Sequence, residues 1–277
     1  MINISSYLAK RLPASVSKPL IIAAALSVTL VVSGCQKHPD INKADDSTQT
    51  ASTQSINTQT NETQQTATEQ QQAPLTILAL GDSLTEGLGV DNDANYPSQL
   101  EARLKELGYK DVKVVNSGLS GETSTGLVNR LDWVLQTKPD ITILTVGAND
   151  AIRGIDVATV EANIRTAVKR LQDNGSEVIL GGMQIYDNLG SDYVESFAAI
   201  YPRVAKDMNV TLIPFFLDGV GGDPKLNQAD AIHPTKEGYT IIVNDNILPI
   251  LQPKIEKLEA NHANTATKSS TPTETTQ

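Results

Sequence analysis

Residues 75–84 read Leu-Thr-Ile-Leu-Ala-Leu-Gly-Asp-Ser-Leu, and this stretch decides the fold. Its apolar part, Thr76 to Leu80, is short and unbroken, which is typical of a strand buried on both faces. Gly81 follows and permits a sharp turn, and the hydroxyl of Ser83 comes directly after that turn. The stretch therefore predicts a strand inside a parallel sheet, with polar groups at its carboxyl end.

Further runs of the same kind recur along the chain, separated by stretches with helical spacing. The other predicted strands are Val112 to Val115, Ile141 to Val146, Val178 to Leu180 and Thr211 to Ile213. Apolar residues at helical spacing fall within 96–107, 127–134, 157–171, 194–208 and 239–250. We expect Gly108 and Asn174-Gly175 to end two of these helices and Pro202 to kink the fourth.

This alternation predicts the fold class. Five strands alternating with five helices imply parallel pairing with right-handed crossovers, hence an α/β protein with a three-layer α/β/α sandwich and a five-stranded parallel sheet. In such sheets, functional sites lie beyond the carboxyl ends of the strands.

The composition divides the chain into four parts. Residues 75–257 can form one domain with a substantial core. Residues 35–74 are rich in Gln and Thr, and beyond the cysteine that begins them we expect a disordered tether with an end-to-end distance of roughly 35 Å. Residues 258–277 are predicted to be a disordered Thr/Ser-rich tail.

Residues 1–34 have the features of an export signal. Lys10, Arg11 and Lys18 precede an apolar run from Leu20 to Val32, which is too short for a comfortable membrane-spanning helix. The run ends at Cys35 in a pattern that resembles the bacterial lipobox, and this resemblance implies cleavage before Cys35 and lipidation of its sulfur. A plain signal peptide followed by a chance cysteine is the alternative.

Cys35 is the only cysteine, which excludes an intrachain disulfide, a catalytic thiol and a cysteine metal cluster. Gln36 after it, rather than aspartate, favours the outer membrane, so we expect an exported lipoprotein facing the periplasm. The net charge of −10 becomes −13 once the three basic residues of the leader are removed. Such an acidic chain is expected to bind neither nucleic acid nor anionic headgroups, so the lipid must supply membrane attachment.

The chain has three histidines, and only His233 lies within the predicted domain. Asp230 stands three residues before it, a spacing that lets its carboxylate accept the Nδ1 proton and turn Nε2 toward a substrate. A solvated loop histidine is the alternative.

Three polar turns follow the first three predicted strands. They are Gly81-Asp82-Ser83-Leu84, Asn116-Ser117-Gly118 and Gly147-Ala148-Asn149-Asp150. A backbone N–H next to a glycine and an asparagine amide are suitable donors to the oxyanion of acyl transfer. Each turn also has a structural interpretation, as a helix cap or ordinary loop chemistry.

Taken together in this order, Ser83, Gly118, Asn149 and His233 resemble the four blocks of the SGNH (GDSL) hydrolase superfamily. The resemblance covers residues 75–255 and is closest to its thioesterase I/lysophospholipase/arylesterase branch, which implies the flavodoxin-like SGNH hydrolase fold. It implies a catalytic triad of Ser83, His233 and Asp230, with an oxyanion hole formed by Ser83, Gly118 and Asn149. Ala148 departs from the second glycine of many members, which puts the acyl-chain preference in doubt.

The resemblance implies hydrolysis of small carboxylic esters or thioesters through an acyl-enzyme, with no metal or other cofactor. A carbohydrate O-deacetylase is the alternative within the enzyme class, and a non-catalytic lipid- or glycan-binding lipoprotein lies outside it. Asn92 stands where a dinucleotide fingerprint needs its third glycine, and no phosphate-loop lysine is present.

Overall fold

The structure is a computed structural model that describes residues 74–186 and 190–269. The predicted signal peptide, the lipidation site at Cys35 and almost all of the predicted tether lie outside the described residues, as do residues 270–277. Within the part of the chain that is described, no helix is both long and apolar enough to cross a bilayer.

The strands form one five-stranded sheet in the order β2-β1-β3-β4-β5, and every pair is parallel. The strands are β1 (Leu75–Gly81), β2 (Val112–Gly118), β3 (Ile141–Thr145), β4 (Glu177–Gly181) and β5 (Thr211–Ile213). All five predicted strands and the parallel sheet are thus confirmed. In the register, Gly81 pairs with Gly118 on one side and Thr145 on the other, so three strands end level with one another.

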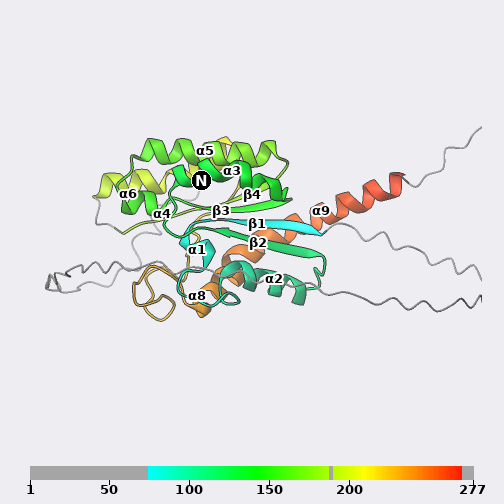
Figure 1. Ribbon diagram of the computed structural model, residues 1–277, viewed down its shortest axis with the longest axis horizontal. Helices are drawn as coiled ribbons and strands as arrows, with labels where there is room; N and C mark the ends of the chain where they lie inside the picture. Colours follow the sequence, from blue (N-terminus) through cyan, green and yellow to red (C-terminus); the bar gives the residue numbers. More distant parts are fainter. Residues whose placement is uncertain (1–73, 187–189, 270–277) are drawn as a thin grey trace, which may run out of the picture. The chain divides into compact units, whose positions relative to one another are not determined.

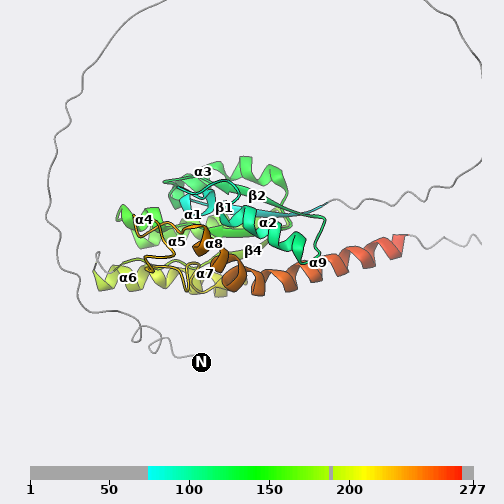
Figure 2. The ribbon, with the colours of Figure 1, turned by 90° about the horizontal axis from the view of Figure 1, so that it is seen from below.

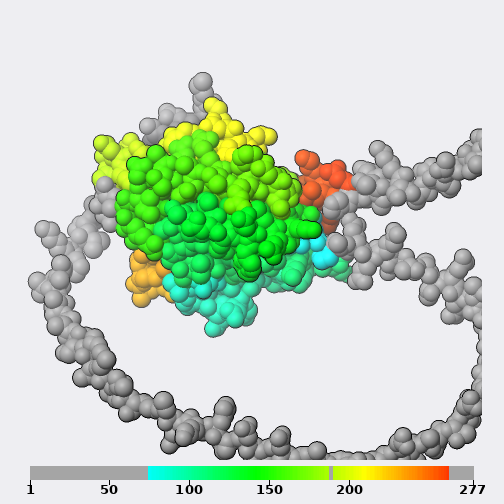
Figure 3. Space-filling model, turned by 45° about the horizontal axis from the view of Figure 1, so that its top comes forward, coloured from blue at the N-terminus to red at the C-terminus, as the bar shows by residue number. Residues whose placement is uncertain are grey.

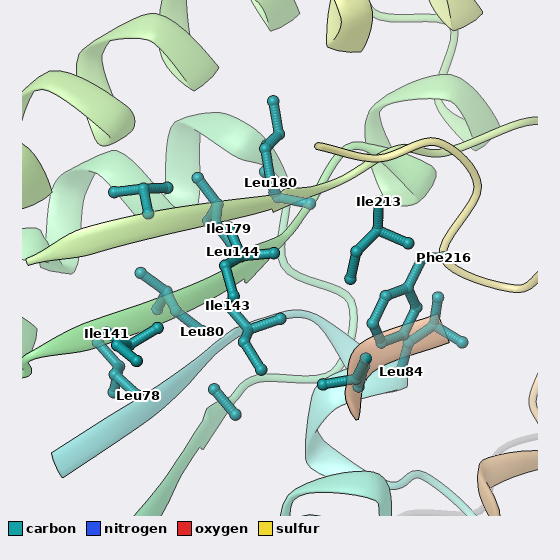
Figure 4. Close-up of a cluster of buried hydrophobic side chains, with 14 of the residues drawn as sticks. Leu78, Leu80, Leu84, Ile141, Ile143, Leu144, Ile179, Leu180, Ile213 and Phe216 are labelled. Atoms are coloured by element: carbon teal, nitrogen blue, oxygen red, sulfur yellow. The ribbon is translucent and has the colours of Figure 1, made fainter. Parts of the chain in front are cut away.

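Helices cover both faces of the sheet, which confirms the three-layer sandwich (Figure 1). On one face lie α3 (Ser124–Val134) and α5 (Val157–Asp173), which pack on each other and form the surface turned forward in Figure 3. On the other lie α2 (Tyr96–Glu106), α8 (Lys236–Ile241) and the first part of α9 (Leu248–Ser269). The side chains of the central strands β1, β3 and β4 are almost all buried between these layers, as Figure 4 shows for Leu78, Ile143 and Ile179.

The predicted fourth helix is broken in two. It consists of α6 (Ser191–Ala198) and α7 (Ile200–Asp207), joined at Ala199. Pro202 lies in the first turn of α7, where its missing N–H leaves the carbonyl of Ala198 without its usual i+4 donor. The expected kink is thus a complete break, three residues before the proline.

The final helical segment is longer and less regular than predicted. A π-helical stretch, Ile242–Ile247, joins α8 to α9, and α9 continues to Ser269. Residues 258–269, predicted as the start of a disordered tail, are therefore helical. The reason lies in the run from Lys254 to Ala260, whose Lys, Glu, Leu and Ala residues favour helix and extend the packed turns around Ile255. Figure 2 shows the end of α9 projecting away from the sheet.

Three short helices that no periodicity could predict lie next to β1 and β3 in the chain. They are α1 (Ser83–Glu86) after β1, the 3-10 turn η2 (Leu135–Thr137) before β3, and α4 (Ala148–Ile152) after β3. Two of these, α1 and α4, begin at the carboxyl ends of the central strands and carry residues of the site.

Candidate active site

Ser83 is the first residue of α1, directly after the central strand β1. Asp82 caps this helix by accepting a hydrogen bond from the Leu84 N–H at 3.1 Å. The turn also positions the Ser83 N–H at the helix N-terminus, where no preceding turn supplies an acceptor. The Ser83 side chain is nearly buried, and its Oγ lies 2.8 Å from Nε2 of His233.

The imidazole is held from its other side by Asp230. The Nδ1 of His233 lies 2.6 Å from Asp230 Oδ2, while Oδ1 accepts the N–H groups of Ile232 at 2.9 Å and His233 at 3.0 Å. Although partial burial acts to raise it, these hydrogen bonds bring the pKa of the Asp230 carboxyl down to about 2. The carboxylate is therefore ionised at neutral pH and fixes the tautomer in which Nε2 faces Ser83.

Two side chains that the sequence analysis did not single out fix the Asp230–His233 loop. The Nε2 of Gln228 donates to the carbonyls of Leu88 at 2.7 Å and Pro234 at 3.1 Å, which ties this loop to the segment after α1. The hydroxyl of Tyr186 donates to the carbonyl of Ala231 at 2.9 Å. Ala231 itself has a φ of 60°, a left-handed conformation that non-glycine residues seldom adopt.

The predicted oxyanion donors lie at the same edge. Asn149 is the second residue of α4, and one N–H of its amide points to Asp82 Oδ2 at 3.4 Å, a long contact. The Gly118 N–H donates to Asn116 Oδ1 at 2.9 Å, so in this structure it is paired within its own turn. Gly118 approaches α1 so closely that a Cβ there would lie 2.0 Å from the backbone nitrogen of Glu86. Only glycine fits at this position.

Asp82 is a fully buried carboxyl group next to the serine. Burial raises its pKa to about 6, against the opposing effects of the Leu84 N–H, the nearby His233 and the amide of Asn149. No sequence pattern assigned it a role, because its burial and its contact with Asn149 depend on the meeting of β1 and α4.

The helix that carries Asn149 is anchored by buried contacts. Asp150 accepts the N–H and hydroxyl of Ser124, at 2.8 and 2.6 Å, which joins α4 to the start of α3. Gly147 precedes α4 with a φ of 120°, and a Cβ there would lie 2.4 Å from the Tyr201 hydroxyl, which donates to the carbonyl of Val146. These contacts fix the position of α4 relative to β1. Within residues 74–186 and 190–269, no three His, Cys, Asp or Glu side chains group as metal ligands.

The structure thus brings Ser83, His233, Asp230 and Asn149 together at the carboxyl edge of the sheet, with Gly118 beside them. A hydroxyl, an imidazole and a carboxylate linked by hydrogen bonds, next to amide donors, form the constellation that defines serine hydrolases. The chain belongs to the GDSL-like Lipase/Acylhydrolase family, whose sequence model matches residues 79–241.

Individual relatives agree. The esterase TesA of Pseudomonas aeruginosa is 37% identical over 185 residues, which cover 66% of this chain and 91% of that protein. The thioesterase 1/protease 1/lysophospholipase L1 of Escherichia coli K12 is 34% identical over 181 residues, covering 65% and 85%. A crystal structure of TesA superposes with a TM-score of 0.61 at 37% identity, covering 64% of this chain and 98% of that one.

The protein is accordingly a carboxylic ester hydrolase with the fold of the SGNH hydrolases. Because the crystallised chain of TesA is matched over 98% of its length, a chain of about this extent folds on its own.

Proposed function

We propose that the protein hydrolyses acyl esters and thioesters through an acyl-enzyme formed on Ser83. Ser83 Oγ attacks the acyl carbonyl carbon while Nε2 of His233 accepts the hydroxyl proton. The tetrahedral intermediate collapses as the imidazolium gives this proton to the departing alcohol or thiol. A water molecule, deprotonated by the same nitrogen, then attacks the acyl-serine, and Ser83 is regenerated with release of the carboxylic acid. Asp230 stabilises the imidazolium in both steps.

The oxyanion of each intermediate requires donors near Ser83 Oγ. The Ser83 N–H, at the N-terminus of α1, and the second N–H of the Asn149 amide supply two of them. Gly118 supplies a third when the substrate oxygen takes the place of Asn116 Oδ1 as acceptor of its N–H. Losing one such donor costs about 3 kcal/mol of transition-state stabilisation.

The observation that carries this proposal is the continuous hydrogen-bond chain from Ser83 Oγ through the imidazole to Asp230, with distances of 2.8 and 2.6 Å. The test uses a fragment of residues 67–277, which contains the whole compact unit that holds the sheet, and the same fragment carrying Ser83→Ala. Turnover of p-nitrophenyl esters and of acyl-thioesters of matched chain length is measured for both. We expect Ser83→Ala to lose activity on both substrates by at least about 10³-fold. Ser196→Ala, which changes an exposed serine of α6, should retain it. Undiminished turnover by Ser83→Ala would refute the mechanism.

We further propose that the chain is an exported lipoprotein held on the outer membrane, facing the periplasm, by a lipid on Cys35. The apolar run from Leu20 to Val32, the position of the only cysteine and the glutamine after it support this proposal. When cells of a Gram-negative host are separated into membrane and soluble fractions, we expect the wild type in the outer-membrane fraction. We expect Cys35→Ser in the soluble periplasmic fraction. If both forms stay with the membrane, or if both are soluble, lipidation at this residue is contradicted.

A further inference from the structure

Exposed large apolar side chains are unevenly distributed over the described residues. Five of the seven, between 41% and 66% exposed, follow the carboxyl ends of the strands. We call these five the apolar rim: Leu88, Leu119, Ile152, Tyr186 and Ile232. The other two, Leu107 and Trp133, lie at or near the C-terminal ends of α2 and α3. Those helices run back along the sheet, so both side chains belong to the opposite, amino edge (Figure 1).

Hydrogen bonds place the rim around the nucleophile. The Leu88 N–H donates to the Ser83 carbonyl at 3.1 Å, and the Leu119 N–H donates to the carbonyl of Gly81 at 3.0 Å. Leu88 and Leu119 are therefore both held next to the turn that carries Ser83.

The other three rim residues are joined to the same edge. Ile152 ends the helix that carries Asn149, and Arg153 after it donates to the carbonyl of Gly121, two residues beyond Leu119, at 2.8 Å. Ile232 adjoins His233, and the hydroxyl of Tyr186 bonds to the carbonyl of Ala231. These hydrogen bonds thus hold all five rim positions at the edge of the sheet that carries Ser83 and His233.

We propose that the apolar rim docks on the surface of a lipid bilayer and brings Ser83 to acyl chains held there. This proposal rests on the ester hydrolysis proposed above, because it identifies the physical state of the substrate as lipid within an interface. A soluble protein does not gain by exposing apolar side chains together, whereas inserting them among acyl chains removes their surface from water.

The charges nearby define the kind of bilayer. Three exposed carboxylates lie near Leu88 in the chain: Glu86 at the end of α1, and Asp91 and Asp93 after it. They outnumber the cation Arg153 beside Ile152, and the whole chain has a net charge of −10. Anionic headgroups would repel this surface, so docking depends on apolar insertion and favours zwitterionic lipid.

The test measures sedimentation of residues 67–277 with vesicles of phosphatidylcholine. This fragment lacks residues 1–66, so neither the apolar run from Leu20 to Val32 nor Cys35 contributes to its binding to vesicles. We expect Leu119→Gln combined with Ile152→Gln to lower the partition coefficient by at least about tenfold, because two apolar side chains leave the interface. The matched control, Leu107→Gln combined with Trp133→Gln, removes two exposed apolar side chains from the amino edge and should sediment as the wild type does. Vesicles containing phosphatidylglycerol should bind the wild type more weakly.

The proposal is overturned if the wild type fails to sediment, if the control loses as much binding as the rim variant, or if anionic vesicles bind it more tightly. Turnover of a water-soluble p-nitrophenyl ester by the wild type separates the two proposals. Turnover without sedimentation removes only the docking surface, and absence of turnover removes the proposed function whatever the vesicles show.

Discussion

Asp82 is a carboxyl group that the fold buries beside the nucleophile, and its raised pKa makes the stability of the protein depend on pH. Because the folded state holds this proton more tightly than the unfolded chain does, its contribution to stability is full below the unfolded value of 3.8. The contribution is lost as the pH rises through about 6. The charged form therefore destabilises the folded protein at neutral pH.

We predict that the free energy of unfolding of Asp82→Asn, taken relative to that of the wild type, increases by about 2 kcal/mol between pH 4.5 and pH 8. Urea unfolding at the two pH values measures this difference. Asp173→Asn, which changes an exposed carboxylate at the end of α5, should show a far smaller one. A difference between Asp82→Asn and the wild type that stays constant with pH would mean that Asp82 does not titrate in this range.

Ala231, in the loop between Asp230 and His233, has an unfavourable backbone conformation, since its φ of 60° places Cβ close to its own backbone. Its side chain is exposed and provides no packing in return. We predict that Ala231→Gly raises the free energy of unfolding by about 0.5–1 kcal/mol, measured by urea titration. Ala199→Gly, at a helical φ of −72°, should lower it by a similar amount. Destabilisation by both substitutions would show that the loop does not hold Ala231 in the left-handed conformation.

At the scale of elements, Gln228 connects the segment after α1 to the loop of His233. Its amide donates to carbonyls of both, while its own N–H donates to the His233 carbonyl at 2.7 Å. A positioning residue of this kind should affect the chemical step more than substrate binding, since small displacements of reacting groups carry large penalties in rate.

We therefore predict that Gln228→Ala lowers kcat by about tenfold or more, with a much smaller change in KM, in steady-state kinetics on a p-nitrophenyl ester. Gln172→Ala is the matched control, because Gln172 also donates to a backbone carbonyl, that of Met208, far along the chain from the site. Equal effects of the two substitutions, or a change confined to KM, would contradict the positioning role.

The elements also show what the sequence could and could not predict. Strands such as Ile141–Thr145 were predicted closely, because burial on both faces leaves an uninterrupted apolar run. The short helices α1 and α4 were not, since four or five residues contain too little periodicity. The break at Ala199 was displaced from Pro202 because a proline disturbs the turn before it.

The residues of the candidate site likewise divide into those that the sequence could predict and those that it could not. Ser83 and His233 could be predicted because they stand in distinctive patterns beyond strand ends. Gln228 and Tyr186 could not, since their roles depend on backbone carbonyls in other segments, and a carbonyl has no signature in a sequence. The pairing of the Gly118 N–H with Asn116 likewise depends on side-chain geometry at the end of β2.

At the scale of the molecule, the catalytic groups lie at the carboxyl edge of the sheet, while β1 begins and α9 ends toward the opposite edge (Figure 1). Substitutions or deletions at the end of α9 should therefore affect the site only if they disturb the packing of the core. Leu251 and Ile255 are fully buried and Leu258 is half-buried, whereas residues 259–261 are exposed. Over residues 248–261 the buried and half-buried side chains of this helix thus end at Leu258, while the helix itself continues to Ser269.

We predict that deleting residues 259–277 changes the free energy of unfolding by less than about 0.5 kcal/mol and leaves kcat/KM on a soluble ester unaltered, because the side chains just beyond Leu258, at 259–261, are exposed. Ile255→Ala in the undeleted chain should instead lower the free energy of unfolding by about 2–4 kcal/mol, through the cavity left between α9 and the sheet. Urea unfolding measures both effects. If the deletion destabilises the protein as much as Ile255→Ala does, the domain extends beyond Leu258 and the end of α9 belongs to its core.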